Sequence, residues 1–414
     1  MTNFNFDILQ NKENSSYRFS VQSRQKIFEK VTSFSDFKTS DDSYLSLRDE
    51  QWFNIKPAIL SGPYLNEVAQ HKAFSRLKYR VPEITISHYS DASVLPHYII
   101  VTQNGEISQD SYEEYTIKED ESWYSEIDAF TEGEERFCIP RIKASPHWRE
   151  GNVFDFSYAQ GLPVEEIDKP TLYLMAWHHN NVSHWFLDLF SRMWGKHFIP
   201  VKDLKVIVPS PLHPYMRECL HLYGFSDADI IEARKDRVYK FRQLYSVSRL
   251  ASQYNFISPE CTRFYDFMKN HIRSFKASSN KRIYVSRRDT TKRMCVNEEE
   301  LENRLKGKGF EIVQTTPLNL QQRIELFSGA DVVVGSCGAG MFHSLFMPEN
   351  SKVFVTGTPA MNKNSCAFNY IGTQKSQDVH IFSGRNIDNK NITTDNWELD
   401  IDSCLDAIDS ALLY

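Results

Sequence analysis

The chain has 414 residues, of which 41% are hydrophobic and 25% are charged, and its formal net charge is −6. This length exceeds what one hydrophobic core usually supports, so two domains are expected. The acidic balance argues against a nucleic-acid partner, because nucleic-acid-binding domains usually carry a basic excess. Seven scattered cysteines without paired spacing favour reduced thiols over a disulfide framework or a zinc site.

The chain shows no feature of a secreted or membrane-spanning protein. The first residues, MTNFNFDILQNKENSS, have neither the basic nor the apolar region of a signal peptide. No run approaches the ~18 apolar residues of a membrane span. The expected location is the cytoplasm, and peripheral association with the inner face of the membrane stays open.

An α/β domain is expected in the first half, after about 45 polar residues and an acidic stretch at 113–135 that favours a solvated surface. A helix is expected at 183–194, where apolar side chains recur at helical spacing, and another at 215–223. The irregular region near 240–250 is expected to end a first domain of residues 1–245. Strands are expected at 84–86, 97–102, 171–176 and 205–209.

The second half alternates strand and helix signals, which predicts a parallel sheet with crossover helices in a domain of residues 246–385. Asn297 and Asn319 are expected to cap two of its helices, and Gly307 to end the first of them. The segment 386–414 is expected to contain an amphipathic helix. Strands are expected at 283–285, 310–313, 331–335 and 352–355, and a further helix at 263–275.

A glycine loop follows the strand expected at 331–335. Gly335, Gly338 and Gly340 form G-x-x-G-x-G, which is not the dinucleotide-binding order. No acidic residue ends the following strand to bind a ribose, and no Walker A motif is present. The loop is therefore either a turn whose backbone N–H groups meet an anion or a turn held by tight packing.

Two arginines, Arg287 and Arg288, follow the strand expected at 283–285. Ligands of open α/β sheets bind beyond the carboxyl ends of the strands. A guanidinium group can donate two parallel hydrogen bonds to a diphosphate, so a nucleotide or nucleotide sugar is the expected ligand. No convincing Asp-x-Asp metal motif accompanies these arginines, and no metal or other cofactor is expected.

The segment 177–188 contains His178, His179 and His184. These histidines invite a zinc interpretation, but they lack a compact ligand pair with a further carboxylate. His184 and Asp188 are four residues apart and would share one face of a helix. Such a pair could act as a general base, and a capping role at a polar helix start is the alternative.

Three segments resemble glycosyltransferase family 61: NNVSHWFLDLFSR, YVSRRDTTKRMCVNEEEL and FSGADVVVGSCGAGMFHSLFMPENS. The resemblance covers roughly residues 170–360. It implies a GT-B architecture, with two Rossmann-like domains facing across a cleft. The C-terminal domain would bind the nucleotide-sugar donor, most often a UDP-sugar, and the N-terminal domain the acceptor. In this interpretation the C-terminal helix could pack back on the N-terminal domain.

By this resemblance, Asn181, His184 and Asp188 match the acceptor-side pattern N-x-x-H-x-x-x-D. Cys337 stands where the family usually has His, which could alter donor choice or reduce activity, and His343 could compensate. The donor-binding residues implied are Arg287, Arg288, Arg293, Thr316, Ser336, Cys337, Gly338, Ala339, Gly340 and Met341.

The function expected is an inverting, metal-independent glycosyltransferase that moves a sugar to a glycan or glycolipid acceptor. Asp188 is the preferred base and His184 the second choice. The family resemblance implies bacterial surface-polysaccharide or capsule assembly. The alternative is a non-catalytic nucleotide-sugar-binding or assembly protein that lost activity through Cys337. A dinucleotide-dependent oxidoreductase is disfavoured by the glycine order, and no oligomeric state is predicted.

Overall fold

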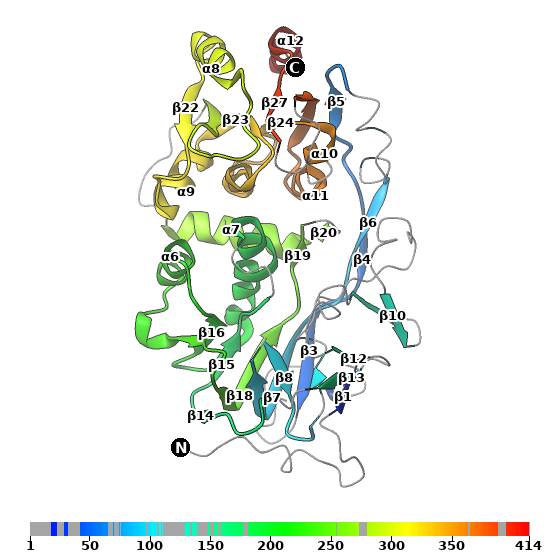
Figure 1. The fold of residues 1–414 in the computed structure, drawn as a ribbon, viewed down its shortest axis with the longest axis vertical. Coiled ribbons are helices and arrows are strands. Elements are labelled where there is room, and N and C mark those ends of the chain that lie inside the picture. Colours follow the sequence, from blue (N-terminus) through cyan, green and yellow to red (C-terminus); the bar gives the residue numbers. More distant parts are fainter. Residues whose placement is uncertain are drawn as a thin grey trace. The chain divides into compact units, whose positions relative to one another are not determined.

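The computed structural model (Figure 1) divides into two compact units, one of Met1–Gln51 with Pro82–Arg249 and the other of Trp52–Val81 with Leu250–Tyr414. Most of the acidic stretch at 113–135 lies outside the described residues, as do His97, His178 and His179. The residues described are 18–22, 29–31, 42–64, 69, 74, 76–96, 98–105, 107–108, 110, 129–132, 135–138, 148–149, 153–155, 159–176, 181–253, 255–272, 280–362, 365–387 and 395–413.

The first unit contains a mixed sheet, where the sequence predicted a Rossmann-like domain. Its centre is β18 (Val238–Val247), which pairs antiparallel with β7 (Ile84–Leu95) and parallel with β15 (Thr171–Tyr173). The strand order is β12-β13-β1-β9-β8-β7-β18-β15-β16-β17, with β14 on β18, β3 on β7 and β2 on β3. The other strands are β1 (Arg18–Gln22), β2 (Glu29–Val31), β3 (Ser43–Arg48), β8 (Ile99–Val101), β9 (Ile107–Ser108), β12 (Trp148–Arg149), β13 (Val153–Asp155), β14 (Val164–Ile167), β16 (Lys205–Pro209) and β17 (Ile230–Ala233), beside a separate hairpin of β10 (Ala129–Glu132) and β11 (Glu135–Cys138).

The central strand β18 occupies the region 240–250 that the sequence analysis expected to be irregular. Lys240 and Arg242 are exposed, whereas Phe241, Leu244 and Val247 are buried. These charged side chains alternate with buried Tyr239 and Phe241, a period-2 pattern of a half-buried strand that the sequence analysis missed. The boundary between the units therefore falls after this strand, at Arg249.

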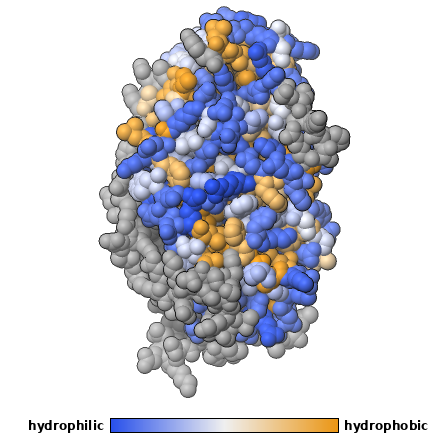
Figure 2. Space-filling model, turned by 180° about the vertical axis from the view of Figure 1, so that it is seen from behind, coloured by the Kyte–Doolittle hydropathy of each residue, from blue (hydrophilic) through white to orange (hydrophobic). Residues whose placement is uncertain are grey.

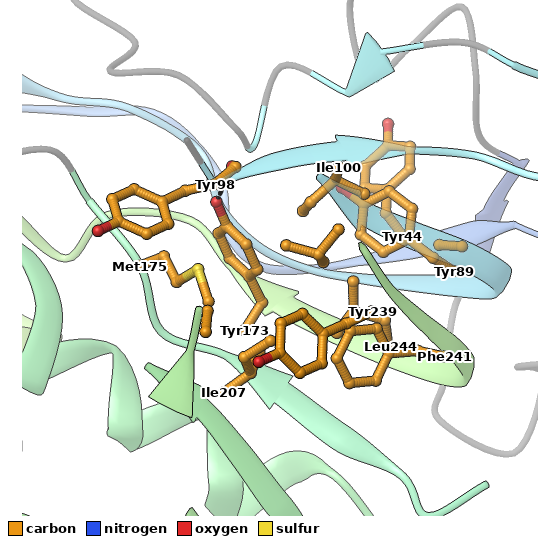
Figure 3. Packing of buried hydrophobic residues seen from close by; sticks show 13 residues of the cluster. Tyr44, Tyr89, Tyr98, Ile100, Tyr173, Met175, Ile207, Tyr239, Phe241 and Leu244 are labelled. Carbon is orange, nitrogen blue, oxygen red and sulfur yellow. Dashed lines mark hydrogen bonds between the residues drawn. The ribbon is translucent and has the colours of Figure 1, made fainter. Parts of the chain in front are cut away.

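The sheet of the first unit buries a core that is rich in tyrosine (Figure 3). Tyr173 from β15 is 1% exposed, and its hydroxyl donates a hydrogen bond to the Tyr98 carbonyl. Buried tyrosines keep a polar tip that needs a partner, which this contact supplies. The cluster consists of Tyr44, Tyr89, Ala92, Val94, Tyr98, Ile100, Tyr173, Met175, Ile207, Ala233, Tyr239, Phe241 and Leu244.

The helical segment expected at 183–194 changes its type twice. It begins as α5 (Val182–His184), continues as the π-helix η6 (Trp185–Leu189) and ends as the 3₁₀-helix η7 (Phe190–Phe198). Trp185, Leu189, Phe190 and Met193 are fully buried, so the predicted apolar face is present. The remaining helices of this unit are α6 (Pro214–Leu222) and the 3₁₀-helix η8 (Asp227–Asp229).

The second unit contains the predicted parallel sheet, in the order β22-β21-β23-β24-β25-β5. All of its pairings are parallel. The last strand, β5 (Ile59–Ser61), comes from the early segment Trp52–Val81 and pairs with β25 through Ile59 and His380. The other strands are β21 (Lys281–Ser286), β22 (Glu311–Gln314), β23 (Ala330–Ser336), β24 (Lys352–Gly357) and β25 (Asp378–Ser383).

Helices and short ladders complete the second unit. Asn319 forms the predicted capping box, because its side chain accepts from the Gln322 N–H at 2.8 Å. The helices are α7 (Pro259–Ile272), α8 (Glu298–Gly307), α9 (Leu320–Ser328), the 3₁₀-helix η9 (Ala339–Phe346), α10 (Pro359–Asn362), α11 (Cys366–Lys375) and α12 (Ile401–Leu412). The ladders are β4 (Gln51–Asn54) with β6 (Lys78–Val81), β19 (Ala251–Ser252) with β20 (Phe256–Ile257), and β26 (Arg385–Asn386) with β27 (Trp397–Glu398).

The C-terminal helix α12 packs on α8 of the second unit, and this corrects the expected packing on the N-terminal domain (Figure 1). Asp402 pairs with Arg304 at 3.0 Å, and Asp409 pairs with Lys308 at 2.6 Å. The apolar residues Ile401, Leu405 and Ile408 are buried. The amphipathic pattern predicted the helix, whereas the choice of α8 as its packing partner depends on these two ion pairs.

The units also differ from the expected domain limits. The sequence analysis placed residues 1–245 in one domain, whereas Trp52–Val81 belongs to the second unit. Among the described residues, no helix is long and apolar enough to cross a membrane. On the face in Figure 2, hydrophobic residues lie in small groups among hydrophilic ones.

Candidate functional site

The second unit brings the two predicted donor motifs together at neighbouring strand ends. The chain leaves β21 through α8 to β22 on one side, and then returns through α9 to β23 on the other side. The sheet order therefore reverses between β21 and β23, which is where open α/β sheets bind ligands. Arg287 directly follows β21, and Cys337 and Gly338 directly follow β23.

The glycines of the loop allow close approach of neighbouring groups. A Cβ on Gly338 would lie 2.0 Å from Nη1 of Arg287, so the guanidinium group rests against this backbone. A Cβ on Gly340 would lie 2.9 Å from Oγ1 of Thr315. Gly338 has an extended φ of 172°, so space rather than backbone strain requires glycine there.

Arg287 is held by its backbone and presents its side chain to the glycine loop. Its N–H donates to Oε1 of buried Glu298 at 2.8 Å, and the Tyr284 hydroxyl donates to the same oxygen at 2.9 Å. Burial raises the pKa of Glu298. The Nε of Arg287 is buried and finds no acceptor among the described residues. Burial lowers the pKa of Arg287, and the nearby charge of Arg293 lowers it further.

The neighbouring arginines Arg288 and Arg293 differ in their ion pairs. Arg288 is exposed, and its guanidinium group lies 3.4 Å from Glu302 and 3.6 Å from Glu299, both on α8. Arg293 has no ion pair within the described residues and takes a left-handed conformation with φ of 57°. The structure thus places Arg287 beside Gly338 and Arg288 against acidic side chains. Nη2 of Arg287 also lies 3.5 Å from the carbonyl of Lys292, which directly precedes Arg293.

Cys337 is buried, and both its N–H and its thiol form hydrogen bonds, the thiol also with Ser365. Its N–H donates to the Thr356 carbonyl at 2.7 Å, and its thiol donates to the Met361 carbonyl at 3.4 Å. Burial raises the pKa of the thiol, although Arg293 and Arg287 oppose that shift. The neutral thiol is therefore favoured, and it supplies no positive charge in place of an imidazole.

His343 has a structural environment in η9. Its Nδ1 donates to the Gly340 carbonyl at 2.8 Å, and its ring lies 5.3 Å from the ring of Phe327. Burial lowers the pKa of His343 to about 3. A neutral, buried ring of this kind supports the glycine loop from behind, so the geometry gives no support for the idea that it compensates for Cys337.

The remaining predicted donor residues divide into packed and exposed ones. Ser336 and Met341 are buried, and Sδ of Met341 would lie 2.6 Å from a Cβ on Gly335. Ala339 is half-buried in the loop, and Thr316 is exposed. The preceding threonine, Thr315, is the one that lies against Gly340.

The first unit holds His184 and Asp188 in contact, as their spacing predicts. Nδ1 of His184 lies 2.6 Å from Oδ2 of Asp188, and both side chains are buried. An ionised carboxylate only accepts, so this contact places the imidazole proton on Nδ1 and the lone pair on Nε2. Asp188 lies in the π-helix η6, a geometry that is frequent at functional sites.

Two buried arginines surround this pair. Nε of Arg192 donates to the Asp188 carbonyl at 2.8 Å, and Nη1 of Arg249 lies 3.8 Å from Oδ2 of Asp188. Burial lowers the pKa of Arg192 to about 10, and Arg249 contributes to that shift. Two guanidinium groups thus lie close to Asp188, one at its carbonyl and one near its carboxylate.

Asn181 caps the start of α5. Its Oδ1 accepts from the Ser183 N–H at 3.0 Å and from the Ser183 hydroxyl at 2.7 Å. The side chain is exposed, and these contacts satisfy one of the orphan donors at a helix start. The motif asparagine thus orients the segment that carries His184.

The carboxylates of the Asp-x-Asp sequences have structural partners. Asp229 completes a capping box with Ser226, and Asp227 pairs with Arg217 at 2.5 Å. Asp400 caps α12 by accepting from the Ser403 N–H. Among the described residues, no group of three or more His, Cys, Asp and Glu side chains is arranged to hold a metal ion.

The sequence analysis missed several residues of these two sites. Arg192 follows Asp188 by one helical turn within a quoted motif, so its spacing could have revealed it. Glu298 lies in the first turn of α8, and its contact with the Arg287 N–H depends on tertiary packing. Thr315, Arg249 and Trp397 carry no local signal.

Residues 182–354 match the family model described as Glycosyltransferase 61. This span includes both the His184–Asp188 pair and the residues around Arg287, so it confirms the resemblance drawn from the motifs and supports a glycosyltransferase. In general, that family implies a nucleotide-sugar donor and a glycan acceptor. A comparison with curated proteins finds no match.

Proposed function

We propose that this protein is an inverting, metal-independent glycosyltransferase that uses a nucleotide sugar, by preference a UDP-sugar. One observation supports the donor side: the Arg287 guanidinium group lies beside Gly338 at the reversal point of a parallel sheet, its Nη2 lies 3.5 Å from the carbonyl of Lys292, which precedes Arg293, and neither arginine side chain forms an ion pair with the described residues. A diphosphate brings the negative charge that such a pair lacks.

The proposed base is His184, with Asp188 as the residue that orients it. This order reverses the preference from the sequence, because Asp188 is 2% exposed and already binds Nδ1 of His184. Nε2 of His184 would take the proton of the acceptor hydroxyl while the hydroxyl oxygen attacks the anomeric carbon of the donor sugar. The bond from that carbon to the diphosphate breaks on the opposite face, and its electron pair leaves with the phosphate oxygen.

The arginines of the donor site would stabilise the leaving group. Charge develops on the diphosphate as the glycosidic bond breaks, and fixed guanidinium groups can meet that charge without reorganisation. Backbone N–H groups at the start of η9 would add to this effect. In this proposal the first unit supplies the base and the second unit binds the donor, in the manner of a GT-B enzyme.

The proposed setting is the assembly of bacterial surface polysaccharide or capsule in the cytoplasm. The acceptor would be a glycan or a glycolipid at the inner membrane face. This part of the proposal is supported by the family match alone.

A thermal-shift screen against nucleotides and nucleotide sugars tests the donor side. A ligand at 100 times its dissociation constant should stabilise the fold by about 2.7 kcal/mol. The absence of any shift with UDP, GDP, CDP, ADP and their sugars would overturn the proposal.

A transfer assay with the donor that binds then separates turnover from binding. The buried thiol of Cys337 favours one alternative, a protein that binds nucleotide sugars without turnover. Release of the nucleoside diphosphate with transfer of the sugar excludes that alternative. Binding without either reaction would favour it.

A further inference from the structure

The loop that carries Arg293 is fastened to the C-terminal segment 395–399. The Met294 carbonyl accepts from the Trp397 N–H at 3.0 Å, and the Val296 N–H donates to the Trp397 carbonyl at 2.8 Å. The Met294 N–H donates to Oδ1 of Asn396 at 3.2 Å. Segments about 100 residues apart thus form a continuous set of backbone contacts.

Asn297 extends this attachment, although the sequence predicted that it would cap α8. Its side chain donates to the Leu399 carbonyl at 2.8 Å and accepts from the Leu399 N–H at 3.0 Å, and it makes no capping hydrogen bond. An amide that satisfies both groups of one distant residue fixes the register between the two segments.

Trp397 also makes a side-chain contact with Arg293 itself. Its indole Nε1 donates to the Arg293 carbonyl at 3.0 Å, and its side chain is fully buried. A Cβ on Gly384, which lies between β25 and β26, would be 2.9 Å from the indole ring, so only glycine fits there. The indole is therefore fixed on both sides.

Arg293 is held in a conformation that arginine rarely adopts. Its φ of 57° lies in the left-handed region, which is unfavourable for residues with a side chain. Such a conformation persists only where surrounding contacts determine it, and it is often found at functional sites. Among the described residues, Nε1 of Trp397 supplies one such contact through its hydrogen bond to the Arg293 carbonyl.

We infer that Trp397 is a positioning residue for the donor diphosphate, and this inference rests on the proposed function. By holding the Arg293 carbonyl, Trp397 keeps the backbone in the conformation that brings the Arg293 guanidinium group near that of Arg287. Trp397 itself contacts no substrate in this role. The segment 395–399 thereby becomes part of the donor site, outside the motifs that resemble the family.

A double-mutant cycle tests this role in the full-length protein. Trp397→Phe removes the N–H and keeps a buried aromatic ring, and Arg293→Met removes the charge. The dissociation constant of the nucleoside diphosphate that binds the wild type most tightly, chosen from UDP, GDP, CDP and ADP, is measured by calorimetry. Trp397→Phe should weaken binding about fivefold, as expected for one hydrogen bond, and Arg293→Met about tenfold or more.

The decisive result is the effect of Trp397→Phe in the Arg293→Met background. If Trp397 acts through Arg293, the second substitution adds less than twofold. A full additional fivefold loss, or no loss in the wild-type background, would overturn the inference. A wild type that binds none of the four nucleotides would instead overturn the proposed function, on which the inference depends.

A second variant covers the case in which Trp397→Phe does not fold. Asn396→Ala removes the acceptor of the Met294 N–H and leaves the indole in place. It should weaken nucleoside diphosphate binding about twofold to threefold, again only while Arg293 is present. An equal loss in the Arg293→Met background would assign the segment a purely structural role.

Discussion

The residues around Arg287 and those around His184 both gather buried charge, but they balance it differently. In the second unit, the side chains of Arg287 and Arg293 form no ion pair with the described residues, and Nη2 of Arg287 lies 3.5 Å from the carbonyl of the residue that precedes Arg293. In the first unit, the Asp188 carboxylate contacts His184 and lies 3.8 Å from Arg249. In the proposed anion-binding site the arginine side chains form no ion pair with the described residues, whereas the proposed proton-transfer site holds an aspartate in contact with an imidazole.

His184→Ala tests the proposed base of the first unit and should have the largest effect. Loss of the base should lower kcat about a thousandfold, while the nucleoside diphosphate affinity stays within about twofold. His221→Ala is a matched control, because His221 also lies 3.0 Å from an aspartate, Asp227, but on the exposed surface of α6. Full turnover in His184→Ala would remove this residue from the reaction.

Asp188→Asn tests whether Asp188 orients the imidazole or acts as the base itself. An amide can donate to Nδ1 and so favour the wrong tautomer, which should lower kcat about a hundredfold or more. The variant also leaves buried Arg192 and Arg249 near a neutral side chain, which should cost about 3 kcal/mol of stability. A thermal unfolding midpoint equal to that of the wild type would contradict the second expectation.

The donor side of the comparison is tested by Arg287→Met against Arg288→Met. The first removes a charge beside Gly338, and nucleoside diphosphate affinity should fall about thirtyfold. The second removes a guanidinium group that faces Glu299 and Glu302, and affinity should change less than twofold. Equal losses in calorimetry would show that the two arginines act only through net charge.

Gly338→Ala gives a smaller and more local effect. The new Cβ would meet Nη1 of Arg287, which must move, while the extended backbone accepts alanine. Nucleoside diphosphate affinity should fall about tenfold, as expected for a displaced charged hydrogen bond, with little change in stability. Gly307→Ala in α8 has open space around its Cβ and should bind normally and gain about 0.5–1 kcal/mol. An unchanged affinity in Gly338→Ala would argue against a diphosphate at this loop.

His343, whose ring lies behind the glycine loop, should give the smallest effect, through its influence on the pH dependence of stability. Burial lowers the pKa of His343 to about 3, so the unfolded chain binds a proton below about pH 6.5 that the folded chain refuses. Stability is therefore full above pH 6.5 and is lost as the pH falls toward 3. His343→Asn keeps a donor for the Gly340 carbonyl but does not titrate. Between pH 6 and pH 5, the free energy of unfolding measured with urea should therefore fall by about 1.4 kcal/mol less in this variant than in the wild type. Parallel profiles for the two proteins would mean that His343 is protonated in the fold.

Local chemistry explains what could be predicted from the sequence. The strand–helix alternation and the capping residue Asn319 act within a few residues, and both appear in the structure. The spacing of His184 and Asp188 likewise predicted their contact. The choice between Arg287 and Arg288 was not predictable, because it depends on Glu298 and Glu302 from a later helix.

Long-range contacts account for the rest. The central strand β18 carries a short apolar–polar alternation at Tyr239–Arg242, but its place at the centre of the sheet depends on its pairing with β7 and β15. Trp397 reaches Arg293 across about 100 residues, and no periodicity records such a contact. Both cases depend on pairing that forms only when the tertiary structure forms.

The strand β5 has a consequence for how the chain is made. Ile59 leaves the ribosome ~320 residues before His380, the residue with which it pairs. At typical synthesis rates this interval is on the order of 20–60 s, during which the edge strand has no sheet to join. A fragment that starts at Leu250 would in turn leave β25 as an open edge, which invites aggregation. The second unit is therefore best produced from the whole chain.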